Sequence, residues 1–235
     1  MAELHRWPVK SLRGEQVGAA RFDDRGMAGD RAYGLIDRRE RRRGSLLTVR
    51  QHNQMLSWAG EYGSTIVDSA EPPVLRGPDG SSWSWTDPGL PDALTESFGM
   101  PLELRAADGQ QDRGHTVLVT IEASRAALER ELGAPVELDR FRTNVHLMLD
   151  APAFAEEIWG AGTILQIGEV ELSVAGDRTG PCIRCAVPSW DPHGRERWPK
   201  LQKWLIEQHE NKFGVIMRVT RPGVARVGDQ AWVQL

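Results

Sequence analysis

The stretch 163-TILQIGEVELSV-174 contains two short apolar runs joined by Gly168 and Glu169. A glycine-containing pair between two strand-like runs is typical of a β-hairpin, so this stretch predicts two paired strands. The same pattern returns at the end of the sequence in 223-GVARVGDQAWVQL-235, around Gly228 and Asp229. We therefore expect short strands to build much of the second half of the chain.

Strand-like runs also occur elsewhere. The segment 3-ELHRWPVKSL-12 is expected to be extended, because Pro8 biases Trp7 toward β geometry. The turn-rich 77-GPDGSSWSWTDPG-89 predicts a hairpin tip or loop. Many short strands at this spacing favour a barrel or sandwich-like β architecture. The further strand candidates are 31-RAYGLID-37, 45-SLLTV-49, 63-GSTIVDS-69, 73-PVLRG-77, 116-TVLVTI-121 and 144-NVHLMLD-150.

Few segments have helical periodicity. In 121-IEASRAALERELG-133, apolar residues share one face and Gly133 supplies a stop. In 197-RWPKLQKWLIEQHEN-211, Pro199 suits a first turn and the apolar residues form one stripe. Shorter helix candidates are 151-APAFAEEIWG-160 and 91-PDALTESFG-99. The polar segment 102-LELRAADGQQDRGHT-116 is the best candidate for a domain boundary, so we expect domains at residues 1–112 and 113–235.

Composition narrows the class of protein. The chain has 235 residues, 40% hydrophobic and 26% charged, with a formal net charge of −4. This balance gives no overall attraction to nucleic acid or to anionic membranes. The first residues contain no apolar segment of the signal-peptide type, and no apolar run is long enough for a membrane span. With only two cysteines, we expect a cytoplasmic protein whose thiols stay reduced.

Both cysteines lie in 176-GDRTGPCIRCAVPSWDPHG-194, as Cys182 and Cys185. A redox dithiol would normally precede a helix, whereas prolines follow this pair closely. A structural zinc site would need two more ligands, such as His193 and His209. The pair could also be buried as small hydrophobic residues. A fourth reading is that one thiolate binds a soft transition metal. The segment alone leaves these alternatives open.

Basic and polar side chains recur near the ends of the expected strands. Arginine grips phosphate through a planar fork, and lysine does so as a point charge. Beside Arg31, Asp30 is expected to be an ordinary turn carboxylate rather than a group that orients the arginine. Lysine, arginine and small polar donors together suit an anionic ligand. These anchor residues are Lys10, Ser11, Arg31, Arg50, Arg142 and Asn144.

These segments together resemble the MOSC domain family, in particular its two-part members, such as the mitochondrial amidoxime-reducing component and its bacterial relatives. Three positions depart from that pattern: Trp7 replaces the usual tyrosine, Thr143 replaces a proline, and His193 directly precedes Gly194 in the cysteine motif. The resemblance implies a mainly β fold with a few helices (α+β), with a β-barrel MOSC domain preceded by a β-rich N-terminal domain. It rests on WPVKSLRG (7–14), GMAGDRAYGLID (26–37), LLTVRQ (46–51), RFRTNV (140–145), FAEEIWG with ILQIGEVEL (154–172), CIRCAVPSWDPHG (182–194) and PGVARVGDQAWV (222–233).

The resemblance implies a molybdenum cofactor, a pterin dithiolene that carries a phosphate; pyridoxal phosphate is not expected. Cys185 matches the cysteine that binds the metal in relatives and would be the catalytic residue. Cys182 would be a neighbour that packs against the site, and Arg184 and Arg178 would screen the negative charge. A donor after the expected strand 116–121, Thr120 or Ser124, would add a contact. The implied cofactor-binding residues are Lys10, Ser11, Arg31, Arg50, Thr120, Arg142 and Asn144.

The implied activity is that of an oxidoreductase that reduces N-hydroxylated or related N-oxygenated small molecules. The chain has no cysteines for an iron–sulfur cluster, so electrons are expected from a separate reductase or ferredoxin. His193 is a candidate proton donor, but a solvated loop histidine is favoured. One alternative is a carrier of the molybdenum cofactor or of sulfur, or a sulfurtransferase. Another is a zinc-stapled binding module that uses Cys182, Cys185, His193 and His209.

Overall fold

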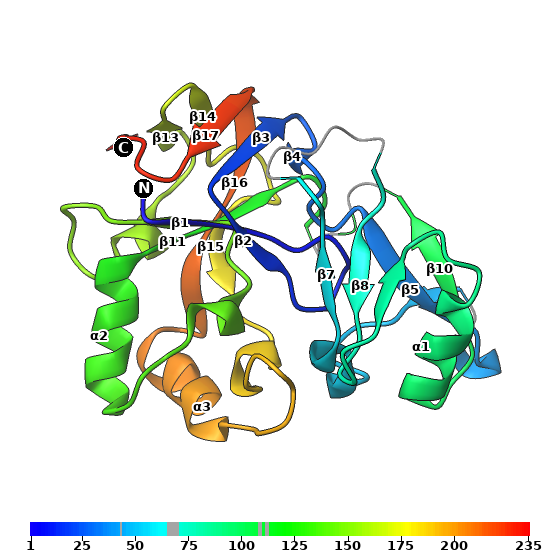
Figure 1. Cartoon of the computed structure of the whole chain (residues 1–235). Helices are drawn as coiled ribbons and strands as arrows, with labels where there is room; N and C mark the ends of the chain where they lie inside the picture. The colour runs from blue at the N-terminus through cyan, green and yellow to red at the C-terminus, as the bar shows by residue number, and fades with distance from the viewer. Residues whose placement is uncertain (43, 65–70, 108–109, 111–112) are drawn as a thin grey trace.

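The structure is a computed structural model that describes residues 1–42, 44–64, 71–107, 110 and 113–235. It is mostly β, with α-helices at its periphery, so the predicted fold class is confirmed (Figure 1). The expected strand 63–69 falls largely outside the described residues. Residues 108–109 and 111–112, just before the expected domain boundary, lie outside them too, and that boundary stays a prediction.

One curled sheet forms the centre of the molecule. Its strands follow the spatial order β18-β13-β14-β16-β11-β12-β1-β2, and β15 also pairs with β16. The long β16 runs through the sheet and contacts β11, β14 and β15 (Figure 1). The strands are β1 (Glu3–Arg6), β2 (Glu15–Val17), β11 (Val117–Ile121), β12 (Val145–Leu147), β13 (Ile164–Ile167), β14 (Val170–Ser173), β15 (Gly180–Ile183), β16 (Lys212–Arg221) and β18 (Ala231–Gln234).

Smaller sheets flank this centre. The strands β10, β5 and β6 form one of them, β17, β3 and β4 a second, and β7, β8 and β9 a third. Their bounds are β3 (Ala19–Asp23), β4 (Gly26–Met27), β5 (Tyr33–Asp37), β6 (Ser45–Leu46), β7 (Ala59–Glu61), β8 (Val74–Arg76), β9 (Ser82–Ser84), β10 (Leu102–Ala106) and β17 (Gly223–Arg226).

Three of the predicted helices are confirmed. They are α1 (Leu90–Phe98), α2 (Glu122–Leu132) and α3 (Pro199–Gln208). Gly99 and Gly133 end α1 and α2 in the left-handed conformation that glycine adopts easily. The segment expected as a helix at 151–160 forms only a 3₁₀ turn, η4 (Ala155–Ile158). The other 3₁₀ turns are η1 (Glu40–Arg42), η2 (Asn53–Ser57), η3 (Leu138–Phe141) and η5 (Val187–Ser189).

The predicted hairpin at 163–174 is confirmed, because β13 and β14 pair directly in antiparallel register. The similar pattern at 223–235 was read wrongly as a repeat of that hairpin. Strand β17 pairs with β3, while β18 pairs with β13. Two strands that are adjacent in sequence therefore diverge to different sheets, because each finds its apolar partners elsewhere.

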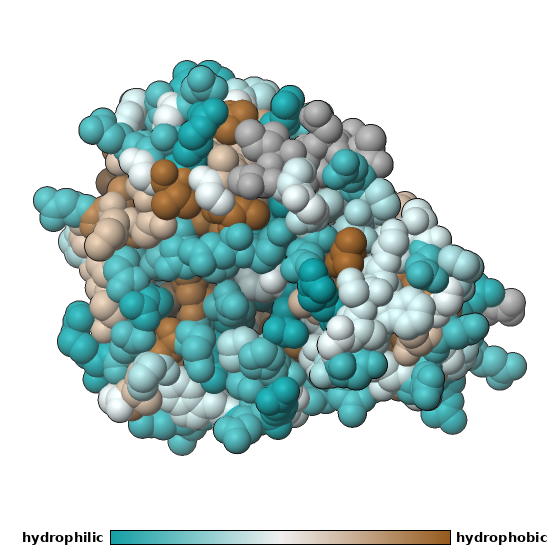
Figure 2. Space-filling view, in the orientation of Figure 1, coloured by the Kyte–Doolittle hydropathy of each residue, from teal (hydrophilic) through white to brown (hydrophobic). Residues whose placement is uncertain are grey.

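The core consists of separate apolar clusters. The largest lies under the main sheet and includes Leu4, Phe22, Val145 and Val215. A second occupies the N-terminal part around Leu35 and α1, and a third lies between α2, α3 and Phe213. Strands β1 and β2 belong to the same sheet as strands from the C-terminal half, and residues of β3 and β4 pack into the same cluster. The face shown in Figure 2 is mainly hydrophilic, with hydrophobic areas interrupted by polar side chains.

This interleaving decides where the candidate site forms. Strand β1 is antiparallel to β12, so the residues after β1 and those before β12 lie at the same end of the sheet. Strand β11 is parallel to β12, so the residues before β11 lie there as well. Lys10, Arg142 and Arg113, which are far apart in sequence, therefore approach one another.

Candidate functional site

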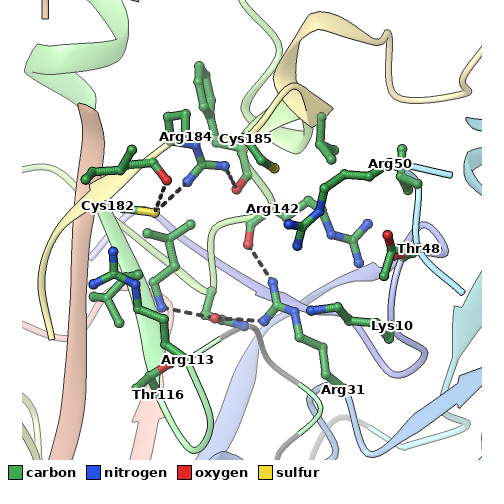
Figure 3. A pocket seen from close by; sticks show the side chains of 18 residues that line it. Lys10, Arg31, Thr48, Arg50, Arg113, Thr116, Arg142, Cys182, Arg184 and Cys185 are labelled. Carbon is green, nitrogen blue, oxygen red and sulfur yellow. Dashed lines mark hydrogen bonds between the residues drawn. The ribbon is translucent and has the colours of Figure 1, made fainter. Parts of the chain in front are cut away.

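A pocket with a volume of about 170 Å³ lies at this end of the sheet and is lined from both halves of the chain. Figure 3 shows its basic side chains converging around a space bordered by the two cysteines. Leu118 and Ile216, which are directly opposite each other across β11 and β16, both line it. The remaining lining residues are Lys10, Ser11, Arg31, Thr48, Val49, Arg50, Arg113, Thr116, Phe141, Arg142, Asn144, Cys182, Ile183, Arg184, Cys185 and Val187.

The backbone is unusual where the pocket is most polar. Ser11, Arg31 and Arg142 have φ values of 71°, 50° and 55°. Residues with a Cβ atom rarely adopt this left-handed region, and such conformations cluster at ligand-binding and active sites. Local sequence preference does not favour them, so the surrounding tertiary contacts must hold these three residues.

Arg31 is fixed by several partners. Its guanidinium donates hydrogen bonds to Asp30 Oδ2, to Asn144 Oδ1 at 3.3 Å and to the carbonyl oxygen of Arg142 at 3.0 Å. Asp30 is only 4% exposed, and its Oδ1 accepts a hydrogen bond of 2.9 Å from the backbone N–H of Trp7. The expectation of an ordinary turn carboxylate at position 30 was therefore wrong, because burial and two anchoring contacts make Asp30 the group that orients Arg31.

Arg142 lies over the ring of Trp7, with its guanidinium carbon 4.4 Å from the ring centroid. Its Nη1 donates to the carbonyl oxygen of Leu12 at 2.7 Å, whereas its buried Nη2 has no hydrogen-bond partner among the described residues. Burial, followed by the positive charge of Arg31, lowers the pKa of Arg142 to about 9. The protein alone therefore stabilises this cation poorly, and an anion in the pocket would supply what is missing.

The side chain of Asn144 forms its hydrogen bonds with other residues of the protein. Its Oδ1 accepts from the backbone N–H of Leu118 at 3.1 Å as well as from Arg31, and its Nδ2 donates to the carbonyl oxygen of His5 at 3.3 Å. The side-chain amide thus ties β1, β11 and Arg31 together. Asn144 borders the pocket, but its polar atoms are engaged in holding the basic wall.

The two thiols have different surroundings. Cys182 is buried, and its Sγ accepts a hydrogen bond of 3.2 Å from Nη1 of Arg184. Nη2 of Arg184 donates to the carbonyl oxygen of Phe141 at 2.7 Å. Cys185 follows the end of β15, is half-buried, and borders the pocket together with Cys182. Neither thiol forms a disulfide.

The charged side chains that line the pocket are all basic among the described residues. They are Lys10, Arg31, Arg50, Arg113, Arg142 and Arg184. No carboxylate is among the described residues that line the pocket, although Asp30 lies behind Arg31. A pocket of this kind suits a ligand with negative charge.

Most of the candidate residues from the sequence line this one pocket: Lys10, Ser11, Arg31, Arg50, Arg142, Asn144 and Cys185. Thr120 does not line it. Its hydroxyl is fully buried and is hydrogen-bonded to Thr143 Oγ1 at 3.1 Å and to Nδ1 of His146 at 2.9 Å. Ser124 donates to Glu156, away from the pocket.

The other nominated side chains divide in the same way. Arg184 lines the pocket, whereas His193 and Arg178 are exposed residues outside its lining. Sequence reasoning missed Thr48, Arg113 and Thr116. Thr48 lies in the same segment as Arg50 and could have been nominated from that neighbourhood. Arg113 lies in a polar connection with no pattern of its own, so only the tertiary structure reveals it.

The ligand set required by the zinc-stapled alternative does not assemble. His209 bonds to Glu131 at 2.7 Å, on the surface next to α3. Throughout the part of the chain that the structure describes, no group of three or more histidine, cysteine, aspartate or glutamate side chains is arranged to hold a metal ion. Within the same residues, no helix combines the length and apolar character needed to cross a membrane.

Fold and site together define a β-rich protein with a basic, thiol-bordered pocket between two interleaved segments. Residues 107–232 match the MOSC domain model, and residues 1–74 match the MOSC N-terminal beta barrel domain. The chain belongs to the MOSC domain family and has its two-part form.

Among solved structures, the chain shows similarity to the YUAD protein from Bacillus subtilis. It is 14% identical, with a TM-score of 0.46, over 98% of this chain and 92% of that chain. A second is YiiM from Geobacillus stearothermophilus, at 20% identity and a TM-score of 0.39 over 51% of this chain and 54% of that chain. No curated protein matches the chain.

Proposed function

We propose that the pocket binds a molybdenum cofactor and that the protein is an oxidoreductase for N-hydroxylated or related N-oxygenated small molecules. The observation that carries this proposal is the convergence of Lys10, Ser11, Arg31, Arg142 and Cys185 on one pocket. These are the phosphate anchors and the thiol that the family resemblance implies. A reducing compartment such as the cytoplasm would keep the thiol available.

The residues present fit such a group. The phosphate of the cofactor is an anion, and the pocket offers several cations and no carboxylate among its described lining residues. The metal of the cofactor is a soft ion, and the pocket offers the thiol that such an ion prefers. The unpartnered Nη2 of Arg142 is the clearest sign, because a buried guanidinium nitrogen without an acceptor is costly. An anion bound against Arg142 would remove that cost.

Each of the anchor residues would make a different contact with the phosphate of the cofactor. Lys10 and Ser11, on the turn after β1, would supply a point charge and a hydroxyl to the phosphate. Arg31 would present a guanidinium already fixed by Asp30 and Asn144, so little conformational entropy would be lost on binding. Arg142, next to Arg31, would add its unpartnered Nη2.

When bound, the molybdenum cofactor supplies two-electron chemistry and the position at which oxygen is removed from a substrate. Cys185 would contribute the thiolate that such a soft metal prefers. Overall, an N-hydroxy compound, two electrons and two protons would give the reduced nitrogen compound and water. The electrons would come from a separate reductase or ferredoxin.

A carrier or sulfur-transfer role is the second candidate, and one observation favours it. Both Cys182 and Cys185 border the same pocket, and Arg184 already donates to the sulfur of Cys182. A carrier would release its cofactor or sulfur to an acceptor protein, whereas an oxidoreductase would retain the cofactor through many turnovers.

The test uses the full chain expressed together with the cofactor biosynthesis pathway. Molybdenum analysis and pterin fluorescence should give about one cofactor per chain, and reduced viologen should drive reduction of benzamidoxime. Cys185→Ser should abolish turnover and leave the fold intact, while Cys182→Ser, the matched control, should retain most of it. Protein without molybdenum or pterin, or a fully active Cys185→Ser variant, would contradict the proposal.

A further inference from the structure

The basic residues of the pocket are spread across it rather than gathered on one side. Figure 3 shows Lys10, Thr48 and Arg50 on one side of the pocket and Arg113 on the opposite side, in the part of the view that also contains Cys182. Arg31 and Arg142 lie between these sides. The proposed phosphate anchors therefore account for one side only.

Arg113 is half-buried, and its guanidinium has no structural partner within the described part of the protein. Its guanidinium makes no hydrogen bond or ion pair with any residue that the structure describes. This contrasts with Arg31, Arg142 and Arg184, each of which donates to a backbone carbonyl. A partly desolvated arginine that borders a pocket and has no described partner there is a ready donor for an anionic group.

A second cation reinforces this side. A Cβ atom placed on Gly114 would lie 3.1 Å from Nη1 of Arg178, so the Arg178 guanidinium lies against the backbone next to Arg113. Arg178 likewise makes no hydrogen bond or ion pair within the described residues. The Arg178 guanidinium thus adds a second positive charge close to the backbone that carries Arg113, just outside the pocket lining, and neither arginine has a neutralising partner in the described ranges. Two neighbouring positive charges favour binding of an anion.

Part of the pocket wall is apolar. Leu118 and Ile216 form part of the wall, and the neighbouring Ile183 is 61% exposed. A ligand that reaches from the thiols toward Arg113 would therefore lay a hydrophobic body on these side chains and point its charge at the arginine. An apolar wall with one directing charge is the usual composition of a small-molecule site.

We propose that Arg113, supported by Arg178, is an anion subsite and that substrates of this pocket carry a carboxylate on an apolar body, in addition to the N-oxygenated group. This inference rests on the proposed function. The anionic group bound at Arg113 could come from either of two sources: the carboxylate of a substrate, or the diphosphate of a nucleotide attached to the cofactor. We assign it to the substrate, and the experiment distinguishes the two sources.

The experiment uses cofactor-loaded protein driven by reduced viologen, with benzamidoxime and 4-carboxybenzamidoxime as paired substrates. The measured quantity is the ratio of kcat/KM for the carboxylated substrate to that for the neutral one, which cancels differences in cofactor loading. We expect a ratio of about ten in the wild type, since one well-placed charged contact is worth about a factor of ten. Arg113→Gln should bring the ratio close to one, and Arg113→Lys should restore part of it.

A binding measurement provides a readout that does not depend on turnover. Calorimetry with 4-carbamoylbenzoate, which carries the carboxylate but no reducible N–O bond, should show binding that Arg113→Gln weakens about tenfold. Arg130→Gln, on the exposed end of α2, is the matched control and should leave both the ratio and the binding unchanged.

The outcomes are distinguishable. A wild-type ratio near one, or an Arg113→Gln ratio equal to that of the wild type, would overturn the substrate assignment. So would mass spectrometry that finds a nucleotide on the released cofactor. If loaded protein reduces neither substrate, the proposed reductase function fails, and the calorimetry still decides whether Arg113 binds a carboxylate.

Discussion

The indole Nε1 of Trp7 donates a hydrogen bond of 2.8 Å to the carbonyl oxygen of Thr143. Both positions depart from the family motifs, and the structure places them in direct contact. The same indole supports the guanidinium of Arg142, and the backbone of Trp7 contacts Asp30 and Arg31. Trp7 is therefore a common support for the basic wall of the pocket.

Trp7→Phe should weaken this support. The variant loses the indole N–H and part of the ring under Arg142, so we expect the free energy of unfolding to fall by about 1–2 kcal/mol. We also expect several-fold weaker binding of pyrophosphate to the cofactor-free protein, measured by calorimetry. Trp83→Phe is the control, because the Trp83 indole bonds to Ser81 in a distant hairpin. Equal effects of the two substitutions would contradict a special role for Trp7.

Asp30→Asn should loosen Arg31 without changing side-chain size. The neutral amide keeps a contact to Trp7 but gives up the ion pair, so the Kd for pyrophosphate should rise about tenfold, equivalent to about 1.4 kcal/mol. Calorimetry on the cofactor-free chain measures it. Asp79→Asn, in an exposed turn with Ser81, should leave the Kd unchanged. An unaltered Kd in Asp30→Asn would mean that Asp30 does not orient the arginine.

Thr120→Val separates a buried structural hydroxyl from a ligand contact. The hydroxyl joins Thr143 and His146 away from the pocket lining, so its loss should lower the free energy of unfolding by about 1–2 kcal/mol. The pyrophosphate Kd should stay within about twofold of the wild type, whereas Lys10→Ala should raise it about tenfold or more. Denaturant titration and calorimetry provide the two measurements. A large rise in Kd for Thr120→Val would return Thr120 to the binding site.

Glu156 should make stability depend on pH. Burial raises the pKa of this fully buried carboxyl to about 7, against 4.5 in its ordinary state, and burial also raises the pKa of neighbouring Glu157 to about 8. The unfolded chain therefore ionises first. The stabilising contribution of the protonated group is complete below the unfolded pKa and is lost as pH rises toward 7.

Glu156→Gln replaces the ionisable carboxyl with a neutral amide, so the variant should not lose stability as pH rises. We expect the variant to unfold with a free energy roughly 2–3 kcal/mol above the wild type at pH 8, and with no such advantage at pH 4. Denaturant titrations at both pH values measure the difference. Glu96→Gln, on the exposed face of α1, should show no pH-dependent gain. A constant difference at the two pH values for Glu156→Gln would contradict the assignment.

The predictable part of the fold is local. Helices α1, α2 and α3 follow from periodicity and from the glycines or proline at their ends, and the β13–β14 hairpin follows from its short glycine-containing connection. The pairing of β17 and β18 could not be read in this way. Strand partners far apart in sequence are chosen by the apolar faces available in three dimensions, not by adjacency.

The candidate site divides along the same line. The basic residues Lys10, Arg31 and Arg142 suggested an anionic ligand before any geometry was known, whereas the metal-binding role of Cys185 was implied only by the family resemblance. The role of Asp30 and the position of Arg113 could not be derived, because burial and the direction of a guanidinium depend on neighbours from other segments.

The amino-acid sequence by itself determined which chemistry the chain carries: cations and small polar donors at strand ends, one cysteine pair, and a β-rich pattern. Tertiary structure alone decided which of these groups meet. The antiparallel pairing of β1 with β12 brings the turn after β1 to Arg142, and the left-handed Ser11, Arg31 and Arg142 are held there by long-range contacts. Local preference opposes that conformation, so only the packed whole can stabilise it.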